Sequence, residues 1–266
     1  MTQPVQLYRG YAFDLDGTIY LGDRLIPGAD AIIAALREAG SRVVFVTNKP
    51  IESNDDYVAK LNKLGIPTEL KDVVSATDAL VLYLQRKAAG ARILPVAEGV
   101  VIDALSAAGF PVVTDPAQAD VVVVSFDRTF DYDKLTRAYQ AVVHHGARIV
   151  ATNPDPYCPT PDGGLPDCAA MLAAVEACTG AKAEAIVGKP SSFMAETFLD
   201  RLGVPAHEAV MVGDRLLTDV AMGLSAGMAS ALVLSGATTA EQLESAPFEP
   251  THVLADVNGL RTPEIV

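Results

Sequence analysis

The sequence predicts an α/β protein with a doubly wound parallel sheet, and three observations indicate this fold class. Short runs rich in β-branched residues alternate with segments of helical spacing along most of the chain, a pattern typical of parallel sheets covered by helices. Several of these runs end directly in polar residues, as strands do at the edge where open α/β sheets bind ligands. The alternation begins anew near residue 83, which indicates a second α/β domain inserted into the first.

The first part of the chain shows the order strand, helix, strand, helix, strand. An apolar segment that begins at Tyr11 is expected to be the first strand. No Gly-x-Gly-x-x-Gly follows it, so a dinucleotide-binding fold fits poorly. Apolar residues at helical spacing, followed by Gly40, predict the first helix. The expected elements are a helix over 27–40, a strand over 42–46, a helix over 55–64 and a strand over 72–75.

The inserted domain is expected over residues 83–183, and residues 1–82 and 184–266 are expected to form the core domain around it. A proline-rich loop over 153–166 follows the last strand of the insert, and Asp167 is expected to cap the helix after this loop. The expected elements of the insert are strands near 92–96, 112–114, 120–125 and 148–151, and helices near 99–108, 133–145 and 167–178.

The chain then returns to the core domain. An apolar run over 185–188 leads into Lys189-Pro190, and a later β-branched run leads into Gly213-Asp214. Both runs resemble the first strand in ending at polar residues. The expected elements are helices over 192–202 and up to about 225, and strands over 209–212, 230–234 and 252–254.

The composition fits a soluble cytoplasmic protein. Half of the 266 residues are apolar, but no uninterrupted apolar stretch approaches the roughly 18 residues that cross a bilayer, and the first nine residues lack the order of a secretion signal. The cysteines, Cys158, Cys168 and Cys178, lack the spacing of a zinc site or a disulfide framework. The net charge of −13 argues against a nucleic-acid partner, while local cations and a bound metal would still admit a small anionic substrate.

Two carboxylates, Asp14 and Asp16, stand at the end of the first predicted strand, and Gly17 follows them directly. Residues two apart in a strand point to the same side, so both carboxylates are expected to converge on one point. Like charges so close are costly unless a cation lies between them or one carries a proton. Both solutions suit phosphoryl transfer. For an Asp-x-Asp-Gly sequence alone, a helix N-cap or a solvated turn is the simpler interpretation.

Three further polar clusters follow apolar runs: Thr47-Asn48, Lys189-Pro190, and Gly213-Asp214-Arg215 with Thr218-Asp219. Each cluster alone has a simpler interpretation. Thr47 and Asn48 would start a turn, Lys189 would be a surface residue, and the aspartates would cap a helix. Because the carboxyl ends of parallel strands meet at one edge of a sheet, the clusters are expected to lie together, and this favours a functional site.

In this order the four clusters resemble the motifs of the haloacid dehalogenase (HAD) superfamily of phosphatases. Asp14-Leu15-Asp16-Gly17-Thr18 is similar to the first motif, and the other three clusters are similar to the second, third and fourth. The insert resembles the large α/β cap of the branch that contains NagD, AraL and pyridoxal phosphatase (subfamily IIA), so the resemblance covers nearly the whole chain. The chain departs from this branch at Lys49, where a second asparagine is common. Lys49 either adds positive charge near the site or points into solvent.

The resemblance implies a Mg²⁺-dependent phosphomonoesterase that hydrolyses small phosphorylated metabolites through an aspartyl phosphate. Asp14 would be the nucleophile, and Asp16 would act first as general acid and then as general base. Mg²⁺ would be held by Asp14, the main-chain carbonyl of Asp16 and Asp214, with Asp219 in support. An oxygen-rich site of this kind suits Mg²⁺ rather than zinc.

The resemblance also implies how phosphate and the leaving group are recognised. Thr47, Asn48 and Lys189 would hold the phosphoryl oxygens, whereas the cap would select the substrate. The candidate specificity residues lie in or beside the proline-rich loop: Asn153, Asp155 and Asp167. Caps of this branch often dimerise, so a homodimer through the cap is expected.

Asp167 has two interpretations. Relatives often carry a Pro-Gly-x-Gly-like sequence at this point, whereas this chain has Leu165-Pro166-Asp167-Cys168, which is similar to the AraL pattern. The carboxylate would either hydrogen-bond a sugar hydroxyl or only cap the helix.

Other functions stay open at this point. A phospho-acceptor, receiver-like signalling module also carries Asp, Thr and Lys at strand ends, but it has no need of an inserted domain. A phosphosugar mutase fits the size and position of the insert poorly, and a dehalogenase leaves Asp16 and the metal ligands without a purpose. Among phosphatases, the substrate is open between sugar phosphates, nucleoside monophosphates, phosphoglycolate and pyridoxal phosphate, with p-nitrophenyl phosphate as an expected artificial substrate.

Overall fold

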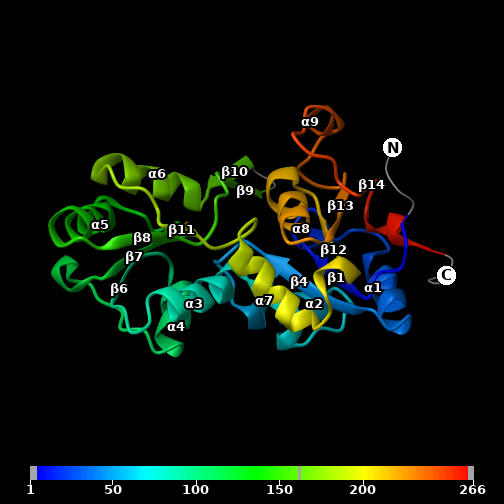
Figure 1. Cartoon of the computed structure of the whole chain (residues 1–266), viewed down its shortest axis with the longest axis horizontal. Helices are drawn as coiled ribbons and strands as arrows, with labels where there is room; N and C mark the ends of the chain where they lie inside the picture. The colour runs from blue at the N-terminus through cyan, green and yellow to red at the C-terminus, as the bar shows by residue number, and fades with distance from the viewer. Residues whose placement is uncertain (1–4, 161–162, 263–266) are drawn as a thin grey trace. The chain divides into compact units, whose positions relative to one another are not determined.

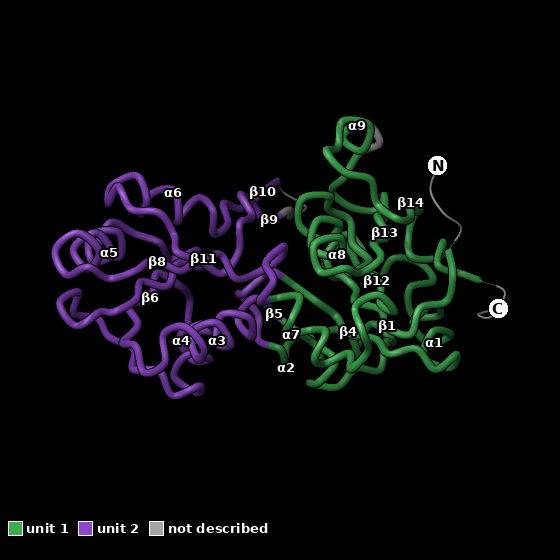
Figure 2. The backbone as a smooth tube through the Cα atoms, viewed as in Figure 1, with its two compact units in different colours: residues 1–47, 54–74, 194–266 green, residues 48–53, 75–193 purple. Residues whose placement is uncertain are grey.

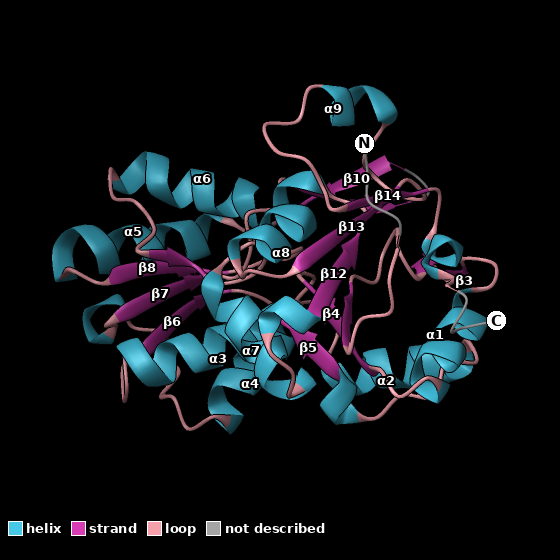
Figure 3. Cartoon of the chain, turned by 45° about the vertical axis from the view of Figure 1, so that its right-hand side comes forward, coloured by secondary structure: helices cyan, strands magenta, loops and turns pink. Residues whose placement is uncertain are grey.

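The computed structural model describes residues 5–160 and 163–262 (Figure 1). The chain forms two compact units, the first from residues 1–47, 54–74 and 194–266 and the second from residues 48–53 and 75–193 (Figure 2). Each unit has its own β-sheet flanked by helices (Figure 3), so the predicted α/β class is confirmed. The chain passes between the two units at four points, whereas a single insert would give two. The expected boundaries of the insert, at residues 83 and 184, stay a prediction.

A six-stranded sheet forms the centre of the first unit. Its strand order is β14-β13-β12-β1-β4-β5, and the pairs from β14 to β4 are parallel. The first strand of the chain therefore lies between β12 and β4. The strands are β1 (Gly10–Phe13), β4 (Arg42–Thr47), β5 (Val73–Ser75), β12 (Ala209–Gly213), β13 (Ala229–Val233) and β14 (His252–Leu254), with a separate hairpin of β2 (Tyr20–Leu21) and β3 (Arg24–Leu25).

The helices of the first unit follow the predicted apolar spacing. In α1 the buried residues Ile32, Ile33 and Leu36 recur at three- and four-residue intervals, which places them on one face. The elements are α1 (Ala29–Glu38), α2 (Asn54–Lys63), α7 (Ser192–Leu202), α8 (Ala221–Ser225) and α9 (Ala240–Glu244), with a π-helical turn over Leu216–Val220 and 3₁₀ turns over Leu70–Asp72, Ala206–Glu208 and Val257–Leu260.

The second unit holds a four-stranded parallel sheet with the order β11-β8-β7-β6. Figures 1 and 3 show α5 and α6 on one face of this sheet and α3 and α4 on the other. The elements are α3 (Ala76–Lys87), β6 (Ile93–Val96), α4 (Gly99–Ala107), β7 (Val121–Val124), α5 (Tyr132–His145), β8 (Arg148–Ala151), β9 (Tyr157–Thr160), β10 (Gly163–Pro166), α6 (Cys168–Thr179) and β11 (Ala185–Ile186), with a 3₁₀ turn over Pro116–Gln118.

The structure differs from the sequence-based expectation in several segments. The run that begins at 185 was expected to return to the core domain, but β11 pairs with β8 in the sheet of the second unit. Helix α3 was not expected; it begins directly after β5, where Ser75 and Asp78 form a capping box. The strand expected over 112–114 is reduced to a single bridge between Ile93 and Val112. Residues 153–166, expected to be a loop, contain the antiparallel pair of β9 and β10. The prolines that favoured a loop are compatible with this pair, because edge strands tolerate proline.

Both units have apolar interiors. Tyr11, Phe13 and Phe45 are fully buried in the first unit, and the rings of Tyr11 and Phe13 stack with their centroids 5.9 Å apart. The four consecutive valines of β7 are fully buried in the second. All three cysteines are thiols. Within the described ranges, no helix is both long and apolar enough to span a membrane.

Candidate active site

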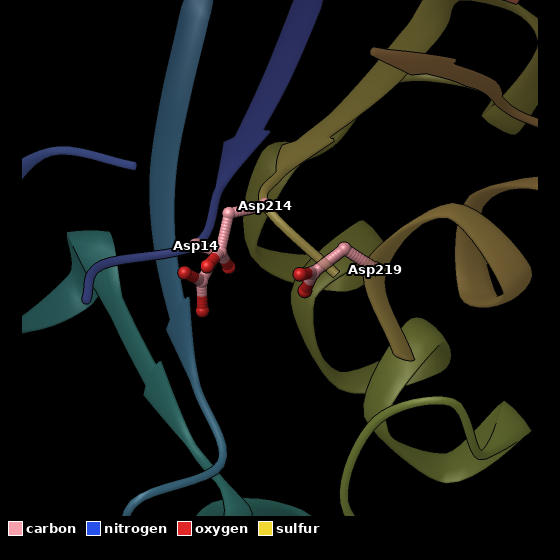
Figure 4. A group of neighbouring side chains, drawn as sticks. All are labelled: Asp14, Asp214 and Asp219. Carbon is pink, nitrogen blue, oxygen red and sulfur yellow. The ribbon is translucent and has the colours of Figure 1, made fainter. Parts of the chain in front are cut away.

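Three aspartates meet at the carboxyl ends of the central strands of the first unit. Phe13 pairs with Val212, so Asp14 and Asp214 follow neighbouring strands, and the Asp14 N–H donates to the Val212 carbonyl at 2.8 Å. Carboxylate oxygens of Asp14, Asp214 and Asp219 all lie within 4.8 Å of one another. Figure 4 shows the three side chains converging. We call this group the carboxylate triad.

Asp219 reaches the triad from the π-helical turn that follows β12. Its Oδ2 accepts a hydrogen bond from the Arg215 N–H at 3.1 Å, and the residue is fully buried. A Cβ atom at Gly213 would lie 2.3 Å from the Asp219 Cγ, closer than any real contact allows. The last position of β12 therefore has to be glycine for Asp219 to enter the triad.

Asp214 is the member of the triad whose negative charge is least compensated by the protein. Its Oδ2 accepts a hydrogen bond from the Ala237 N–H at 2.6 Å, but its Oδ1 is buried without a hydrogen-bond partner. Burial, followed by the charges of Asp14 and Asp219, raises the pKa of Asp214 well above its usual range. A divalent cation would neutralise these charges and give the unpartnered oxygen a ligand, and oxygen donors of this kind are those that Mg²⁺ prefers. The residues present therefore fit Mg²⁺.

Asp16 is not part of the triad. Strand β1 ends at Phe13 and a turn follows it, so the expectation that Asp14 and Asp16 share one face of a strand is wrong. Asp16 instead forms a bridge with Tyr20 and is half-buried. Its roles as general acid and as a main-chain metal ligand stay predictions.

A loop that was not expected from the sequence supports the triad, and it is formed by Ser235, Gly236 and Ala237. Ala237 supplies the N–H that Asp214 accepts, and the Ser235 hydroxyl donates to the Gly17 carbonyl at 2.7 Å. A Cβ atom at Gly236 would lie 2.0 Å from the Asp214 Oδ2. The sequence signals a turn here, because Ser235 and Gly236 follow the apolar run of β13, but it gives no signal for the contact of Ala237 with Asp214.

Two threonines lie near this edge of the first unit. Thr47 is the buried last residue of β4, the strand beside β1, and its contact with phosphate stays a prediction. The hydroxyl of Thr18, which the first motif includes without a role, donates to the Asp14 Oδ2 at 3.3 Å.

The other predicted site residues gather in the second unit. The Asn48 Nδ2 donates to the Asp155 Oδ2 at 2.8 Å and to the Lys189 carbonyl at 3.1 Å, while its Oδ1 accepts from the Lys189 N–H at 2.6 Å. The Asn153 Nδ2 donates to the Asp155 Oδ2 and the Asp167 Oδ1, both at 3.0 Å. We call Asn48, Asn153, Asp155 and Asp167 the amide–carboxylate network. Each of its members is buried.

Asp167 caps α6, as expected, and its Oδ1 accepts the Cys168 N–H at 2.5 Å. The residue is buried, and its contact with a substrate stays a prediction. Burial also raises the pKa of the Cys168 thiol to about 11, so this cysteine is a poor nucleophile at neutral pH. Lys49, the departure from the family pattern, is half-buried.

Comparison with known families and proteins agrees with this arrangement. Residues 11–111 match the family model described as haloacid dehalogenase-like hydrolase, and residues 186–260 match the one described as HAD-hydrolase-like. The sugar-phosphatase AraL of Bacillus subtilis (strain 168) is 38% identical over 251 residues, which cover 94% of this chain and 91% of AraL.

Solved structures show the same relationship. A 4-nitrophenylphosphatase from Thermotoga maritima matches with a TM-score of 0.89 and 36% identity, over 95% of this chain and 96% of that protein. NagD from E. coli K-12 matches with a TM-score of 0.87 and 29% identity, over 98% of this chain and the whole of NagD. The similarity therefore includes both units.

Proposed function

Because the chain belongs to the haloacid dehalogenase-like hydrolases, we propose that it is a Mg²⁺-dependent phosphomonoesterase that hydrolyses small sugar phosphates through an aspartyl phosphate. Its place among the phosphatases of the NagD-like branch follows from the similarity over both units. The carboxylate triad supports the finer proposal, because its buried, unpartnered Asp214 oxygen suits a divalent cation.

The proposed reaction has two displacements at phosphorus. The Asp14 carboxylate attacks phosphorus while the bond to the ester oxygen breaks, and Asp16 gives its proton to the leaving alkoxide. A water molecule then attacks the aspartyl phosphate and loses its proton to Asp16, which regenerates Asp14 and releases phosphate. The Thr18 hydroxyl orients the Asp14 carboxylate by its hydrogen bond to Oδ2.

The metal and the phosphate-binding residues stabilise the charges of this reaction. When bound, Mg²⁺ supplies positive charge opposite the transferring phosphoryl group. Asp14, Asp214 and the main-chain carbonyl of Asp16 would hold the ion, and Asp219 would support it.

Thr47, Asn48 and Lys189 are proposed to bind the phosphoryl oxygens. Both protons of the Asn48 amide are donated to protein acceptors, so Asn48 would contribute its main-chain N–H.

The substrate class rests on the relatives. AraL is named a sugar-phosphatase and other relatives are named acid sugar phosphatases, so a sugar phosphate is the proposed substrate. Nucleoside monophosphates, phosphoglycolate and pyridoxal phosphate are the alternatives. A receiver-like signalling module is disfavoured, because the phosphatase relatives match 94% of the chain, including the second unit.

A phosphate-release assay tests the proposal. The enzyme is given sugar phosphates, each alternative ester and p-nitrophenyl phosphate, with Mg²⁺ or with a chelator. We expect release with Mg²⁺ only, and the highest kcat/KM on a sugar phosphate. Beryllium fluoride should be found on Asp14 in a crystal of the Mg²⁺ complex. Equal activity in the chelator would refute the metal dependence, and a fluoride adduct elsewhere would refute the nucleophile.

Two further expectations belong to this proposal. We propose a cytoplasmic enzyme with three free thiols and a homodimer formed through the second unit. No nucleic acid or membrane takes part in the proposed reaction. Sedimentation of the purified chain tests the dimer.

A further inference from the structure

We infer that Asn48 and Asp155 are positioning residues that hold Lys189 in place, so that a residue of the predicted specificity loop affects the hydrolysis of every ester. The inference rests on the proposed function, in which Lys189 binds the phosphoryl oxygens. All of the contacts that support it lie within the second unit.

The side chain of Asn48 binds the main chain of Lys189. Its Oδ1 accepts the Lys189 N–H at 2.6 Å, and one Nδ2 proton goes to the Lys189 carbonyl at 3.1 Å. The amide therefore binds both polar groups of one main-chain residue. Its second Nδ2 proton goes to Asp155, so no N–H of the side chain is left for a phosphate oxygen.

Asp155 fixes the orientation of that amide. The Asp155 Oδ2 accepts hydrogen bonds from both Asn48 and Asn153, and the carboxylate is 8% exposed. If the Asn48 amide were rotated by half a turn, its oxygen would face the Asp155 carboxylate and the Lys189 carbonyl, and its NH₂ would face the Lys189 N–H, so all three contacts would be repulsive. Because Asp155 places an acceptor opposite the Asn48 NH₂ group in this buried position, it favours the orientation in which Asn48 holds Lys189.

Thr152 also holds the main chain beside Lys189. The Gly188 N–H donates to the Thr152 carbonyl at 2.7 Å. A Cβ atom at Gly188 would lie 2.5 Å from that carbonyl and 2.6 Å from the Asn48 Oδ1. Lys189 itself is 2% exposed. Its backbone is thus fixed between the end of β8 and the side chain of Asn48, and a fixed backbone limits where the ammonium group can lie.

Asp155 and Asp167 are matched residues in this network. Both accept a hydrogen bond from the Asn153 Nδ2, and Asp155 in addition accepts one from the Asn48 Nδ2. If Asp155 acts through Lys189, removal of the Asp155 side chain should lower the rate on p-nitrophenyl phosphate, because hydrolysis of this activated ester depends little on contacts with its leaving group. Loss of Asp167 should leave that rate nearly unchanged.

The kinetic experiment compares Asp155→Ala, Asp155→Asn, Asn48→Ala and Asp167→Ala in the full chain, with p-nitrophenyl phosphate and Mg²⁺. We expect Asp155→Ala and Asn48→Ala to lower kcat about tenfold or more, by analogy with displacement of a transition-state donor. Asp155→Asn should retain kcat within about threefold, because an amide oxygen can accept both N–H groups. Asp167→Ala should also stay within about threefold.

A double-mutant cycle shows whether the effect passes through Lys189. Lys189→Met should lower kcat, and adding Asp155→Ala to this variant should lower it no further. A full additional loss in the double variant would overturn the inference, as would an unchanged kcat in Asp155→Ala. An equal loss in Asp155→Asn would overturn it as well, since the charge and not the acceptor would then matter.

Amide hydrogen exchange gives a readout that needs no activity. The Lys189 N–H should exchange faster in Asp155→Ala than in the wild type or Asp167→Ala, because its acceptor on Asn48 is no longer fixed. Unchanged exchange would overturn the inference. If the wild type hydrolyses no phosphomonoester, the proposed function fails while this measurement still tests the positioning of Lys189.

Discussion

The carboxylate triad and the amide–carboxylate network both contain buried aspartates, but their hydrogen-bond balance is opposite. In the triad, Asp14, Asp214 and Asp219 lie within 4.8 Å of one another, and one oxygen of Asp214 has no hydrogen-bond partner. In the network, Asp155 and Asp167 each accept N–H groups from asparagine side chains. Buried carboxylates with enough donors are stable by themselves, whereas buried carboxylates without them need a cation or a proton.

We therefore expect the triad to bind a ligand and the network to keep the structure around itself fixed. Substitutions in the triad should therefore remove activity and change how the protein responds to Mg²⁺. Substitutions at the edge of the network should change stability with little effect on the chemical step.

The largest effect is expected for Asp14→Asn, which should abolish turnover on every ester. Among the four polar clusters no serine, cysteine or histidine can replace the carboxylate as a nucleophile. Initial rates with p-nitrophenyl phosphate and a sugar phosphate measure the effect. A variant that kept more than about a hundredth of the wild-type rate would contradict the assignment, since loss of a general acid or base alone costs about 10²- to 10⁴-fold and loss of the nucleophile should cost more.

The second prediction concerns Asp214→Asn, which should remove Mg²⁺-dependent activity and also the stabilisation by Mg²⁺. In the metal-free protein the folded-state pKa of Asp214 is raised, so the folded state keeps a proton that the unfolded state loses above about pH 4. Stability therefore falls as pH rises from there through the raised pKa. Asp214→Asn removes this loss.

Calorimetry at pH 5 and pH 8, with Mg²⁺ or with a chelator, measures this effect. In the chelator, the Tm of the wild type should fall between the two pH values by more than the Tm of Asp214→Asn. Mg²⁺ should raise the Tm of the wild type alone. A variant that is less stable than the wild type in the chelator at pH 8 would mean that Asp214 is not strained in the metal-free protein.

The third prediction concerns the loop after β13. Gly236→Ala would bring a methyl group to 2.0 Å from the Asp214 Oδ2, so the carboxylate has to move. We expect a loss of about 10- to 100-fold in Mg²⁺ affinity, the usual cost of disturbing groups that orient a metal ligand, measured by the Mg²⁺ dependence of kcat. Gly99→Ala is the control, because a Cβ atom there has no heavy atom within 4 Å. Equal affinities in the two variants would exclude a role for the loop.

The smallest effect on catalysis is expected for Asp167→Ala. Loss of a helix N-cap costs about 0.5–2 kcal/mol, so the Tm should fall by a few degrees while kcat/KM on p-nitrophenyl phosphate stays within about threefold. A sugar phosphate decides between the two interpretations of Asp167. A loss of about tenfold or more on that ester alone would place the carboxylate at the substrate, whereas equal losses on both esters would place it in the common catalytic machinery.

The sequence predicted the fold class and most strands and helices because buried parallel strands and amphipathic helices have clear apolar patterns. Asp14, Asp214 and Asp219, which the motif resemblance named as site residues, lie together at the ends of two neighbouring strands, and their roles stay predictions. The expectation that Asp16 lies in the first strand failed for a physical reason. The apolar pattern does not show that β1 ends at Phe13. The alternation of side chains between two faces holds only within a strand, and Asp16 lies beyond its end.

The supporting contacts could not be predicted from local patterns. Ala237 acts through its main-chain N–H, which every residue except proline carries, so its side chain gives no signal. The pairing of Asn48 with Asp155 joins residues 107 positions apart, and a polar residue after a strand does not reveal its partner. Helix α3 was not predicted, because Ser75, the first residue of its capping box with Asp78, was assigned to the end of an expected strand.

The order of strands in the first sheet also has a consequence for synthesis on the ribosome. Strand β1 gains β4 as a neighbour early, but its other neighbour, β12, is made about two hundred residues later. The sheet of the second unit, from β6 to β11, is complete by residue 186. Domains fold as they emerge, and closing so long a loop is slow. The nascent chain therefore carries β1, an apolar strand with an unpaired edge, until its last quarter is translated, and this interval is when aggregation or capture by a chaperone competes with folding.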